Sequence, residues 1–140
     1  MFLVKTRIGP SKIHGIGVFA DERIPKGQMI WMFDARIDVR VPISDLPTFP
    51  PPMRAFLRKY GYEEMHEDRR TIVLCGDHAR HVNHSNDANV TDGEADLAAR
   101  DIERGEELTC NYYAFDLDAE RKLSQGRSTR AARKSRSVLV

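Results

Sequence analysis

The sequence predicts one small domain that is mainly β with short helices. Apolar residues come in short runs rich in Val, Ile, Phe and Trp, and glycines and prolines that favour turns separate these runs. One stretch, 53–60, instead has apolar residues at helical spacing after a proline. A chain of 140 residues, 41% hydrophobic and 31% charged, is long enough to bury a core of its own.

The first half of the chain is predicted to hold several strands. Phe2–Ile8 alternates weakly and precedes a turn at 9–11, and another strand is expected after Gly17. Met29–Val41 is rich in β-branched and aromatic residues and also favours strand. Pro42–Pro52 holds five of the seven prolines and is not expected to form regular structure.

A short helix, a loop and a buried strand are predicted next. Pro52 suits the first position of a helix over Met53–Tyr60, and Gly61 can end that helix. Tyr62–Asp68 is so rich in charge that we expect a loop. Arg70–Gly76 contains the run Thr-Ile-Val-Leu-Cys and is predicted to be a buried strand.

A short internal repeat occurs near each end of the domain. The pattern Ala-x-x-x-Ile-x-Lys-Gly-x-x-Ile at 20–30 returns at 98–108, with Arg in place of Lys and Leu in place of the last Ile. Both copies favour strand, basic-Gly turn and strand, so the two corners are expected to pack as a pseudo-symmetric pair. Because the match is short, chance similarity is the alternative.

Charge divides the chain near residue 117. Residues 118–140 carry a net charge of +5, which leaves −4 on 1–117, and 86–107 alone holds eight acidic residues. We expect a folded domain over 1–117 and a basic tail over 118–140, with helical turns at its start and disorder after residue 123. The acidic body favours a basic protein or peptide partner over nucleic acid, and the alternative is a merely solvated acidic face.

Cysteine usage and the N-terminal segment predict a cytoplasmic protein, with nuclear association as an option in a eukaryote. Cys75 and Cys110 have neither a metal-binding nor a redox spacing, so both are expected to be reduced thiols. Lys5 and Arg7 interrupt the only apolar start, so no signal peptide is predicted. No apolar run approaches the ~20 residues of a membrane span, so no membrane partner is expected.

Amides and histidines crowd the segment 78–89. Such a polar cluster is not buried without hydrogen-bond partners, so a loop that binds something polar is expected. His78, His81 and His84 recur every third residue, but the Asn and Ser residues around them disfavour the helix that such metal ligands would need. No metal site is therefore predicted.

Three motifs in order carry a resemblance to a known family. The first is Gly15-Ile16-Gly17; Arg80–Asn89 reads Arg-His-Val-Asn-His-Ser-Asn-Asp-Ala-Asn; and Gly105–Tyr112 reads Gly-Glu-Glu-Leu-Thr-Cys-Asn-Tyr. Together they resemble the signature of the SET-domain protein lysine methyltransferases. That family writes the last two motifs as Arg-Phe-Ile-Asn-His-Ser-Cys-x-Pro-Asn and Gly-Glu-Glu-Leu-Thr-aromatic-Asp-Tyr.

The resemblance implies the SET-domain (β-clip) fold of small twisted sheets, with a pseudoknot in which the C-terminal segment passes beneath an earlier loop. It implies methyl transfer from S-adenosyl-L-methionine to a lysine ε-amine of a basic protein, either histone-tail-like or otherwise Lys-rich. Two other classes stay open. One is a catalytically idle SET-like module that binds basic tails. The other is a nucleic-acid-binding protein, which the lack of aromatic residues within the tail disfavours.

The resemblance also assigns roles to individual residues. Tyr112 would be the catalytic residue and would also contact the cofactor. Seven further residues would bind the cofactor, several of them through backbone groups: His14, Gly15, Ile16, Gly17, Arg80, Asn83 and His84. The substrate channel would be lined by Phe33, Cys110, Tyr113 and Phe115.

Some positions depart from the family pattern. Cys110 replaces an aromatic residue that helps to set how many methyl groups are added, so the product state stays open. Asn111 stands for Asp, and Asn86 and Ala88 stand for Cys and Pro. The Cys-rich, zinc-binding segment that follows many SET domains does not occur in this sequence, so the channel would have to close with other residues.

The tail contains one candidate substrate of its own. Residues 131–135 read Ala-Ala-Arg-Lys-Ser, which is similar to a lysine-bearing stretch of a eukaryotic histone tail. Tethering raises local concentration to about the millimolar range, so self-methylation at Lys134 is one expectation. A solvated tail that touches nothing is the more common alternative.

Overall fold

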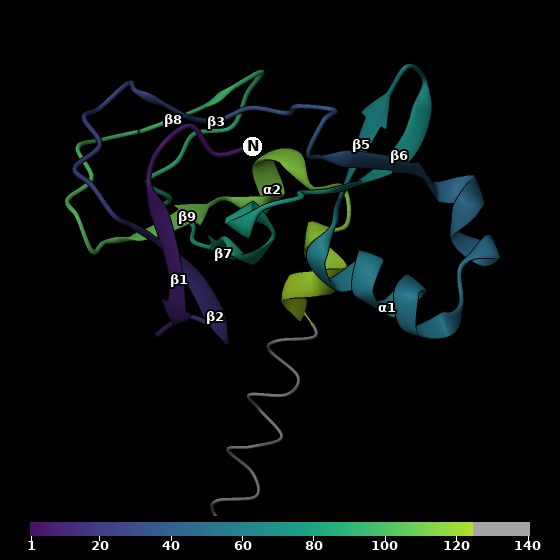
Figure 1. Ribbon diagram of the computed structural model, residues 1–140. Helices are drawn as coiled ribbons and strands as arrows, with labels where there is room; N and C mark the ends of the chain where they lie inside the picture. Colours follow the sequence, from purple (N-terminus) through teal and green to yellow (C-terminus); the bar gives the residue numbers. More distant parts are fainter. Residues whose placement is uncertain (125–140) are drawn as a thin grey trace, which may run out of the picture.

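The computed structural model describes residues 1–124, which form three small sheets and short helices (Figure 1). The elements, with 3₁₀ helices as η, are β1 Thr6–Pro10, β2 Ile16–Ala20, β3 Met29–Trp31, β4 Val39–Pro42, η1 Ile43–Thr48, α1 Pro51–Tyr60, β5 Tyr62–His66, β6 Arg69–Leu74, η2 His78–His81, β7 Asn83–His84, β8 Asp96–Leu97, β9 Glu107–Cys110 and α2 Tyr112–Phe115. The predicted mainly β class is confirmed. The expectations for the tail beyond residue 124, Lys134 included, lie outside the described residues.

The largest sheet has the strand order β1-β2-β9-β7. β1 and β2 form an antiparallel hairpin whose register runs from Thr6 opposite Ala20 to Pro10 opposite Ile16. The predicted turn at 9–11 is therefore wrong at its start, because β1 continues through Pro10. An edge strand tolerates a proline, since the missing N–H would face no neighbour.

β9 is held by hydrogen bonds on both of its sides. It pairs antiparallel with β2 and parallel with β7, with Asn83 opposite Thr109. The segment after β7 returns to the same strand, because the Val90 N–H donates to the Thr109 carbonyl at 3.1 Å and Asn89 Nδ2 donates to the Glu107 carbonyl at 2.8 Å. The C-terminal motif is thus enclosed by the earlier polar segment.

The two copies of the internal repeat, 20–30 and 98–108, pack against each other, as predicted. The N–H of Ile24 donates to the Ile102 carbonyl at 2.8 Å, and the N–H of Ile102 donates back to the Ile24 carbonyl at 2.8 Å. Gly27 and Gly105 occupy matching turns with φ values of 84° and 94°, where a side chain would be strained. The two corners therefore form a pseudo-symmetric pair.

The loop predicted over 62–68 is wrong, because these residues form β5 and a tight turn. β5 pairs with β6, and β4 flanks the other side of β6 to complete a three-stranded sheet. The charge that suggested a loop is paired: the buried Glu63 carboxylate lies 3.2 Å from Arg58 Nη1 and 2.8 Å from Arg70 Nε. The buried strand predicted over 70–76 is confirmed as β6.

Two further predictions need correction between residues 29 and 61. The region 29–41 holds two strands separated by a turn, in which the Ile37 N–H donates to the Asp34 carbonyl at 2.9 Å. The proline-rich stretch contains the 3₁₀ helix η1, and α1 begins at Pro51, since prolines are tolerated in the first helical turn. The predicted helix and its end at Gly61 are otherwise confirmed.

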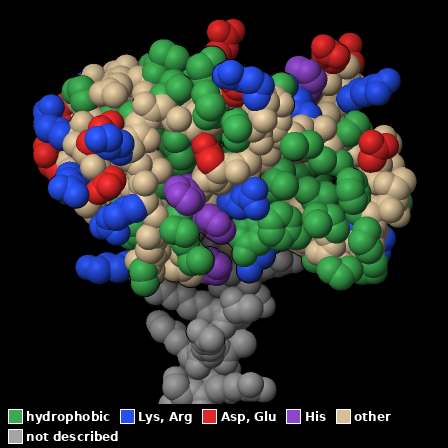
Figure 2. All heavy atoms as spheres, in the orientation of Figure 1, with side chains coloured by type: hydrophobic (Ala, Val, Ile, Leu, Met, Phe, Trp, Pro, Cys, Tyr) green, Lys and Arg blue, Asp and Glu red, His purple; other side chains and the backbone are tan. Residues whose placement is uncertain are grey.

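The apolar interior is split between two clusters. The larger lies between the two corners and includes Val18, Ile24, Ile30, Ile102 and Leu108, while a smaller cluster of Val41, Leu57 and Ile72 lies under α1 and η1. Hydrophobic side chains also gather on the outer surface near α1 and η1 (Figure 2). No helix within residues 1–124 is long and apolar enough to cross a membrane.

The described chain ends in the predicted helical turns, which cover 119–124. Ala119 is buried, and Lys122 Nζ lies 2.7 Å from the buried Asp116 carboxylate. The Asp116 carboxylate also accepts a hydrogen bond from the Glu63 N–H at 3.0 Å, which fixes the end of α2 against β5.

Candidate active site

The glycine motif lies where the loop 11–15 between β1 and β2 enters β2. Gly15 adopts a left-handed φ of 47° with no other atom within 4 Å of the position of a Cβ, so its backbone is open to a ligand. Gly17 is buried, and a Cβ there would collide with the Glu107 carboxylate. One glycine is therefore required by the turn and the other by close packing against β9.

Asn83 ties this loop to β9. Its Nδ2 lies 3.0 Å from the His14 carbonyl, 3.2 Å from the Ile16 carbonyl and 3.0 Å from Glu107 Oε1. Ser11 Oγ, which donates to Glu107 Oε1 at 2.7 Å, lies within 3.1 Å of the same amide. The Asn83 amide has only two N–H groups for these four acceptors, so acceptors outnumber donors in the cluster. The shared hydrogen bonds hold the loop in one geometry.

His84 connects the polar segment to the proposed catalytic tyrosine. Its Nδ1 accepts a hydrogen bond from the Tyr112 N–H at 3.1 Å, so the ring proton lies on Nε2, which donates to Asn86 Oδ1 at 2.9 Å. Asn111 Oδ1 accepts from the Tyr113 N–H at 3.1 Å and caps α2. Asn86 and Asn111, which both depart from the family pattern, thus have defined partners.

The hydroxyl of Tyr112 is fixed in the interior. It donates to the Val82 carbonyl at 2.5 Å. Burial raises the pKa of Tyr112 well above its ordinary range, so the phenol stays protonated at neutral pH. The site therefore offers a neutral, oriented phenol rather than a phenolate.

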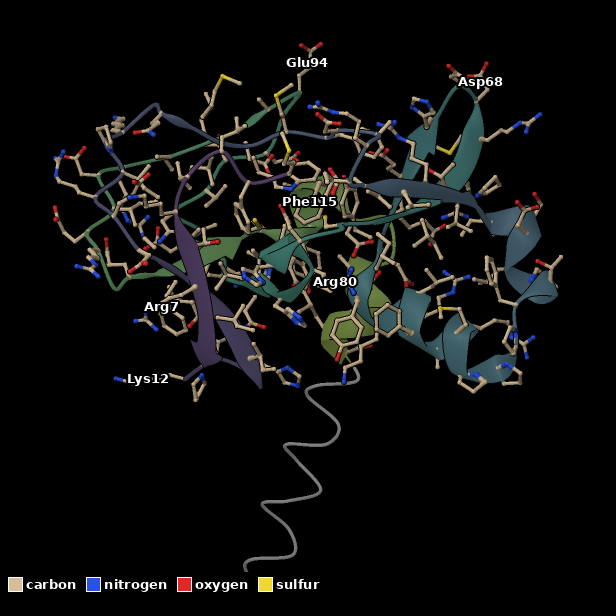
Figure 3. The ribbon with its side chains drawn as sticks, in the orientation of Figure 1. Arg7, Lys12, Asp68, Arg80, Glu94 and Phe115 are labelled. Carbon is tan, nitrogen blue, oxygen red and sulfur yellow. The ribbon has the colours of Figure 1, made fainter. Side chains whose placement is uncertain are left out.

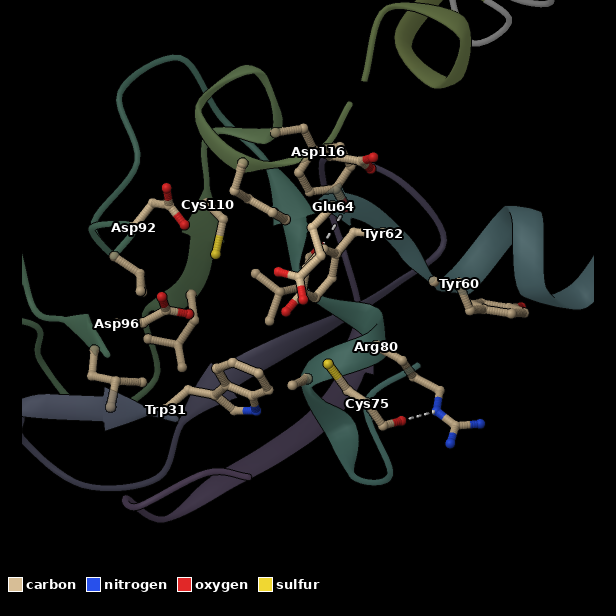
Figure 4. Close-up of a pocket in the computed structure, with 18 of the residues that line it drawn as sticks. Trp31, Tyr60, Tyr62, Glu64, Cys75, Arg80, Asp92, Asp96, Cys110 and Asp116 are labelled. Atoms are coloured by element: carbon tan, nitrogen blue, oxygen red, sulfur yellow. Dashed lines mark hydrogen bonds between the residues drawn. The ribbon is translucent and has the colours of Figure 1, made fainter. Parts of the chain in front are cut away.

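Tyr112 lines a cavity of about 140 Å³ that is open to solvent on one side (Figure 4). Four of the residues proposed from the sequence meet there: Arg80, Cys110, Tyr112 and Phe115. Figure 3 labels Phe115 and Arg80 near the centre of the view. Phe33 does not line this cavity and lies under the Arg40 guanidinium, whose carbon is 3.6 Å from the ring centroid. Tyr113 is 51% exposed and packs on His84.

The cavity has charged groups of opposite sign at its two ends (Figure 4). Arg80 lies at one end, where its Nε donates to the Cys75 carbonyl at 3.1 Å; no carboxylate of residues 1–124 pairs with its guanidinium. Asp92 and Asp96 lie at the other end. Burial raises the pKa of Asp96 to about 7, and the neighbouring Asp92 carboxylate adds to the rise.

The two thiols of the cavity stay neutral. Burial raises the pKa of Cys75 to about 12 and raises that of Cys110 further. Both cysteines are free, as expected. Neither is a nucleophile here, so the chemistry of the cavity depends on its phenol and carboxylates.

A family model described as SET domain matches residues 15–113, most of the described chain. The chain belongs to the SET domain family. SET domains are typical of protein lysine methyltransferases. No curated protein matches the sequence.

Solved SET structures share the fold of this one. The Polycomb Repressive Complex 2 of Chaetomium thermophilum bound to GSK126 is similar with a TM-score of 0.65 and 20% identity over 87% of this chain. The same complex in an autoinhibited conformation, bound to S-adenosylmethionine, has a TM-score of 0.63 and 19% sequence identity, and the match covers 89% of this chain. This SET domain spans 17% of each of those two chains. PFL0690c of Plasmodium falciparum has a TM-score of 0.56 and 21% sequence identity, and the match covers 78% of this chain and 93% of that protein's chain.

Several residues of this SET domain that shape the site were not found from the sequence. Ser11 and Glu107 support the glycine loop, while Trp31, Tyr62 and Asp96 line the cavity. Glu107 lies inside the third motif, so its position beside Gly17 could have been sought there. The others come together only through strand pairing, which the sequence did not specify.

Proposed function

We propose that this SET domain transfers a methyl group from S-adenosyl-L-methionine to the ε-amine of a lysine in a basic protein. The observation that supports this most is the Tyr112 hydroxyl, held by the Val82 carbonyl on the wall of the cavity. Asn83 fixes the glycine loop to β9, and His84 binds the backbone of Tyr112. One short polar segment thus positions both the loop and the tyrosine.

The residues present fit such a cofactor. The open backbone at Gly15, with His14 and Ile16 beside it, can approach a ligand without a side chain intervening. Within residues 1–124, Arg80 uses only its Nε–H, so its other guanidinium N–H groups can bind a carboxylate, which the planar fork suits. When bound, the cofactor would supply an electrophilic methyl group on a sulfonium.

The residues of the chain would orient and desolvate the amine. Because its single proton is donated to the Val82 carbonyl, the neutral Tyr112 phenol can accept a hydrogen bond from an amine without adding charge. Phe115 and Cys110 line the cavity, and the small thiol leaves room that an aromatic side chain would fill. Binding in this cavity would remove the amine from water and align it, which supplies much of the rate enhancement.

The proposed substrate is a basic protein, because the body carries a net charge of −4 over residues 1–117. A lysine-rich protein such as a histone, and Lys134 of the tail itself, are the two candidates. The alternative function, an idle module that grips basic tails, would bind such peptides with no cofactor and no transfer.

The test combines calorimetric titration of S-adenosyl-L-methionine with transfer of labelled methyl to a lysine-rich protein. Tyr112→Phe should keep cofactor binding but lose transfer by about 10²-fold or more, since only the positioned hydroxyl is removed. Tyr113→Phe is the matched control, because that half-exposed tyrosine lies outside the cavity. Peptide binding without cofactor binding would support the idle module instead.

Self-methylation has its own test. The full chain is incubated with labelled cofactor alone, and peptide mass spectrometry then locates the label. A mark on residue 134 that Lys134→Arg abolishes is the expected result. A chain that labels added histones but never itself would leave the tail as a solvated polymer.

A further inference from the structure

Asp96 is a half-buried carboxylate that the proposed function does not yet use. It lies on the cavity wall, less than about a third exposed, and forms no hydrogen bond or ion pair with any other part of residues 1–124. An ionised carboxylate in such a place is costly unless a partner arrives. Glu64, on the same wall, differs because it pairs with Arg40 at 3.1 Å.

The register of a strand pair places Asp96 beside the only tryptophan of the chain. Trp31 of β3 lies opposite Asp96 of β8, so both side chains share one face. Figure 4 shows the Asp96 carboxylate next to the Cys110 thiol and Asp92, with the indole below. Trp31 is nine-tenths buried, and its Nε1 has no hydrogen-bond partner among residues 1–124. The Asp96 carboxylate needs a hydrogen-bond donor or a cation, and no side chain of residues 1–124 supplies one. The Trp31 N–H is itself a donor and does not pair with a cation, so the indole contributes its aromatic face to the cavity.

The remaining walls indicate what kind of ligand that is. Aromatic rings surround the space, namely Trp31, Tyr62, Tyr112 and Phe115. Aromatic faces with a nearby carboxylate favour an alkylammonium ion, through cation–π attraction and charge pairing. The groups near Asp96 are neutral or acidic apart from the chain's amino group: Tyr62, Cys75, Asp92 and Cys110. Glu64 lies on the same wall, and its charge is balanced by Arg40. Within residues 1–124, no side-chain cation lines this end of the cavity.

We propose that Asp96 receives the ε-ammonium of the substrate lysine and takes its proton, so that Tyr112 meets a neutral amine; this inference rests on the proposed methyl transfer. In the step, one N–H bond of the ammonium breaks, the proton passes to a carboxylate oxygen of Asp96, and nitrogen keeps the electron pair. That pair then forms the N–CH₃ bond while the C–S bond of the sulfonium methyl donor breaks, and its electrons stay on sulfur. Asp92, exposed at the mouth, can pass the proton to water.

The environment of Asp96 suits a proton acceptor that works near neutral pH. Its pKa of about 7, raised by burial and by Asp92, leaves the carboxyl partly ionised there, so it can both accept and release a proton. A lysine ammonium has an ordinary pKa of about 10.4. Its pKa falls as it leaves water, so the difference between its pKa and that of Asp96 becomes smaller.

The first experiment tests the ammonium site without any cofactor. Trp31 fluorescence of the full chain is titrated with n-butylammonium, which mimics the end of a lysine side chain, and with n-butanol as its neutral counterpart. Asp96→Asn should weaken n-butylammonium binding by about tenfold or more, because a charge partner is lost while the shape is kept. Glu94→Gln is the matched control, since Glu94 is exposed and lies at the outer edge of the same loop (Figure 3).

Two outcomes of that titration overturn the proposal. One is equal binding of n-butylammonium by Asp96→Asn and Glu94→Gln. The other is equal binding of n-butanol and n-butylammonium by the unmodified chain, which would show an apolar pocket with no role for the carboxylate. Asp92→Asn adds a second variant, and it should weaken binding less because Asp92 is exposed.

The second experiment measures kcat/KM for methyl transfer to a lysine peptide as a function of pH. The unmodified chain should show an inflection near pH 7 that Asp96→Asn loses together with most of the rate, while both bind S-adenosyl-L-methionine equally. Equal rates and profiles for Asp96→Asn and Glu94→Gln would overturn the proposal and leave methyl transfer standing. Ammonium binding through Asp96 without any methyl transfer would overturn the proton-accepting role and the proposed function, and would support the ammonium site alone.

Discussion

Replacing Asp96 with Asn should stabilise the folded chain, and the gain should grow as the pH rises. Burial raises the pKa of this carboxyl from 3.8 to about 7, so between those values the folded state holds a proton that the unfolded state has lost. The free energy of unfolding therefore falls as the pH rises from about 4 to about 7 and stays low above that. Asparagine, which carries no charge, removes this dependence.

The size of the effect follows from the same pKa. Each tenfold change in proton affinity is worth about 1.4 kcal/mol, so the rise corresponds to about 4 kcal/mol of lost stability above pH 7. Water at the open side of the cavity screens part of it, and we expect Asp96→Asn to gain about 2–4 kcal/mol at about pH 8 and about two-fifths of that gain at about pH 5.

Urea unfolding followed by Trp31 fluorescence measures both values. The unmodified chain, Asp96→Asn and Glu94→Gln are compared at about pH 5 and about pH 8, and the exposed Glu94 variant should follow the unmodified chain at both. A gain for Asp96→Asn that is the same at the two pH values would refute the reasoning, because the carboxyl would then titrate as an ordinary exposed one.

Three further substitutions test other parts of the site. Gly17→Ala should destabilise the fold by about 1–3 kcal/mol in urea unfolding, because the new methyl group collides with the Glu107 carboxylate; unchanged stability would show that the carboxylate moves freely. Asn83→Ala should cost about 1–3 kcal/mol and weaken cofactor binding in calorimetry, since the acceptors around the loop lose their donor; retention of full affinity would contradict its positioning role. Cys110→Tyr should lower the highest methylation state seen by mass spectrometry, because a phenol fills space in the cavity; an unchanged product distribution would mean that residue 110 does not limit the products.

The parts of the site made from consecutive residues could be predicted from the sequence. The glycine turn at 15–17, the polar segment before β9 and the tyrosine after it are each set by a few neighbouring residue types, so their local pattern carries the information. The pairing of the corners at 20–30 and 98–108 was also predictable, because both copies of the pattern are present in the chain.

The parts made by distant pairing could not be predicted in this way. The stretch 62–68 is charged in the sequence, yet Glu63 is buried because Arg58 and Arg70 reach it from α1 and β6. Asp96 is one of eight acids in its region and became distinctive only when the β3–β8 register set it beside Trp31. In both cases a polar side chain has a tertiary partner that local composition does not reveal.

The enclosure of β9 has a consequence for how the chain folds. Residues 98–110 supply the partners of the 16–28 region, over separations of about 70 to 90 positions along the chain. Glu107 also contacts Asn83, which holds the glycine loop. Contacts this distant in sequence slow folding, because a long loop must close before any of them forms. During synthesis the edge of β2 stays bare until the last third of the domain has emerged. The proposed methyl transfer would therefore be one of the last properties that a newly made chain acquires, and termination before residue 107 would leave the glycine loop without its contacts to β9.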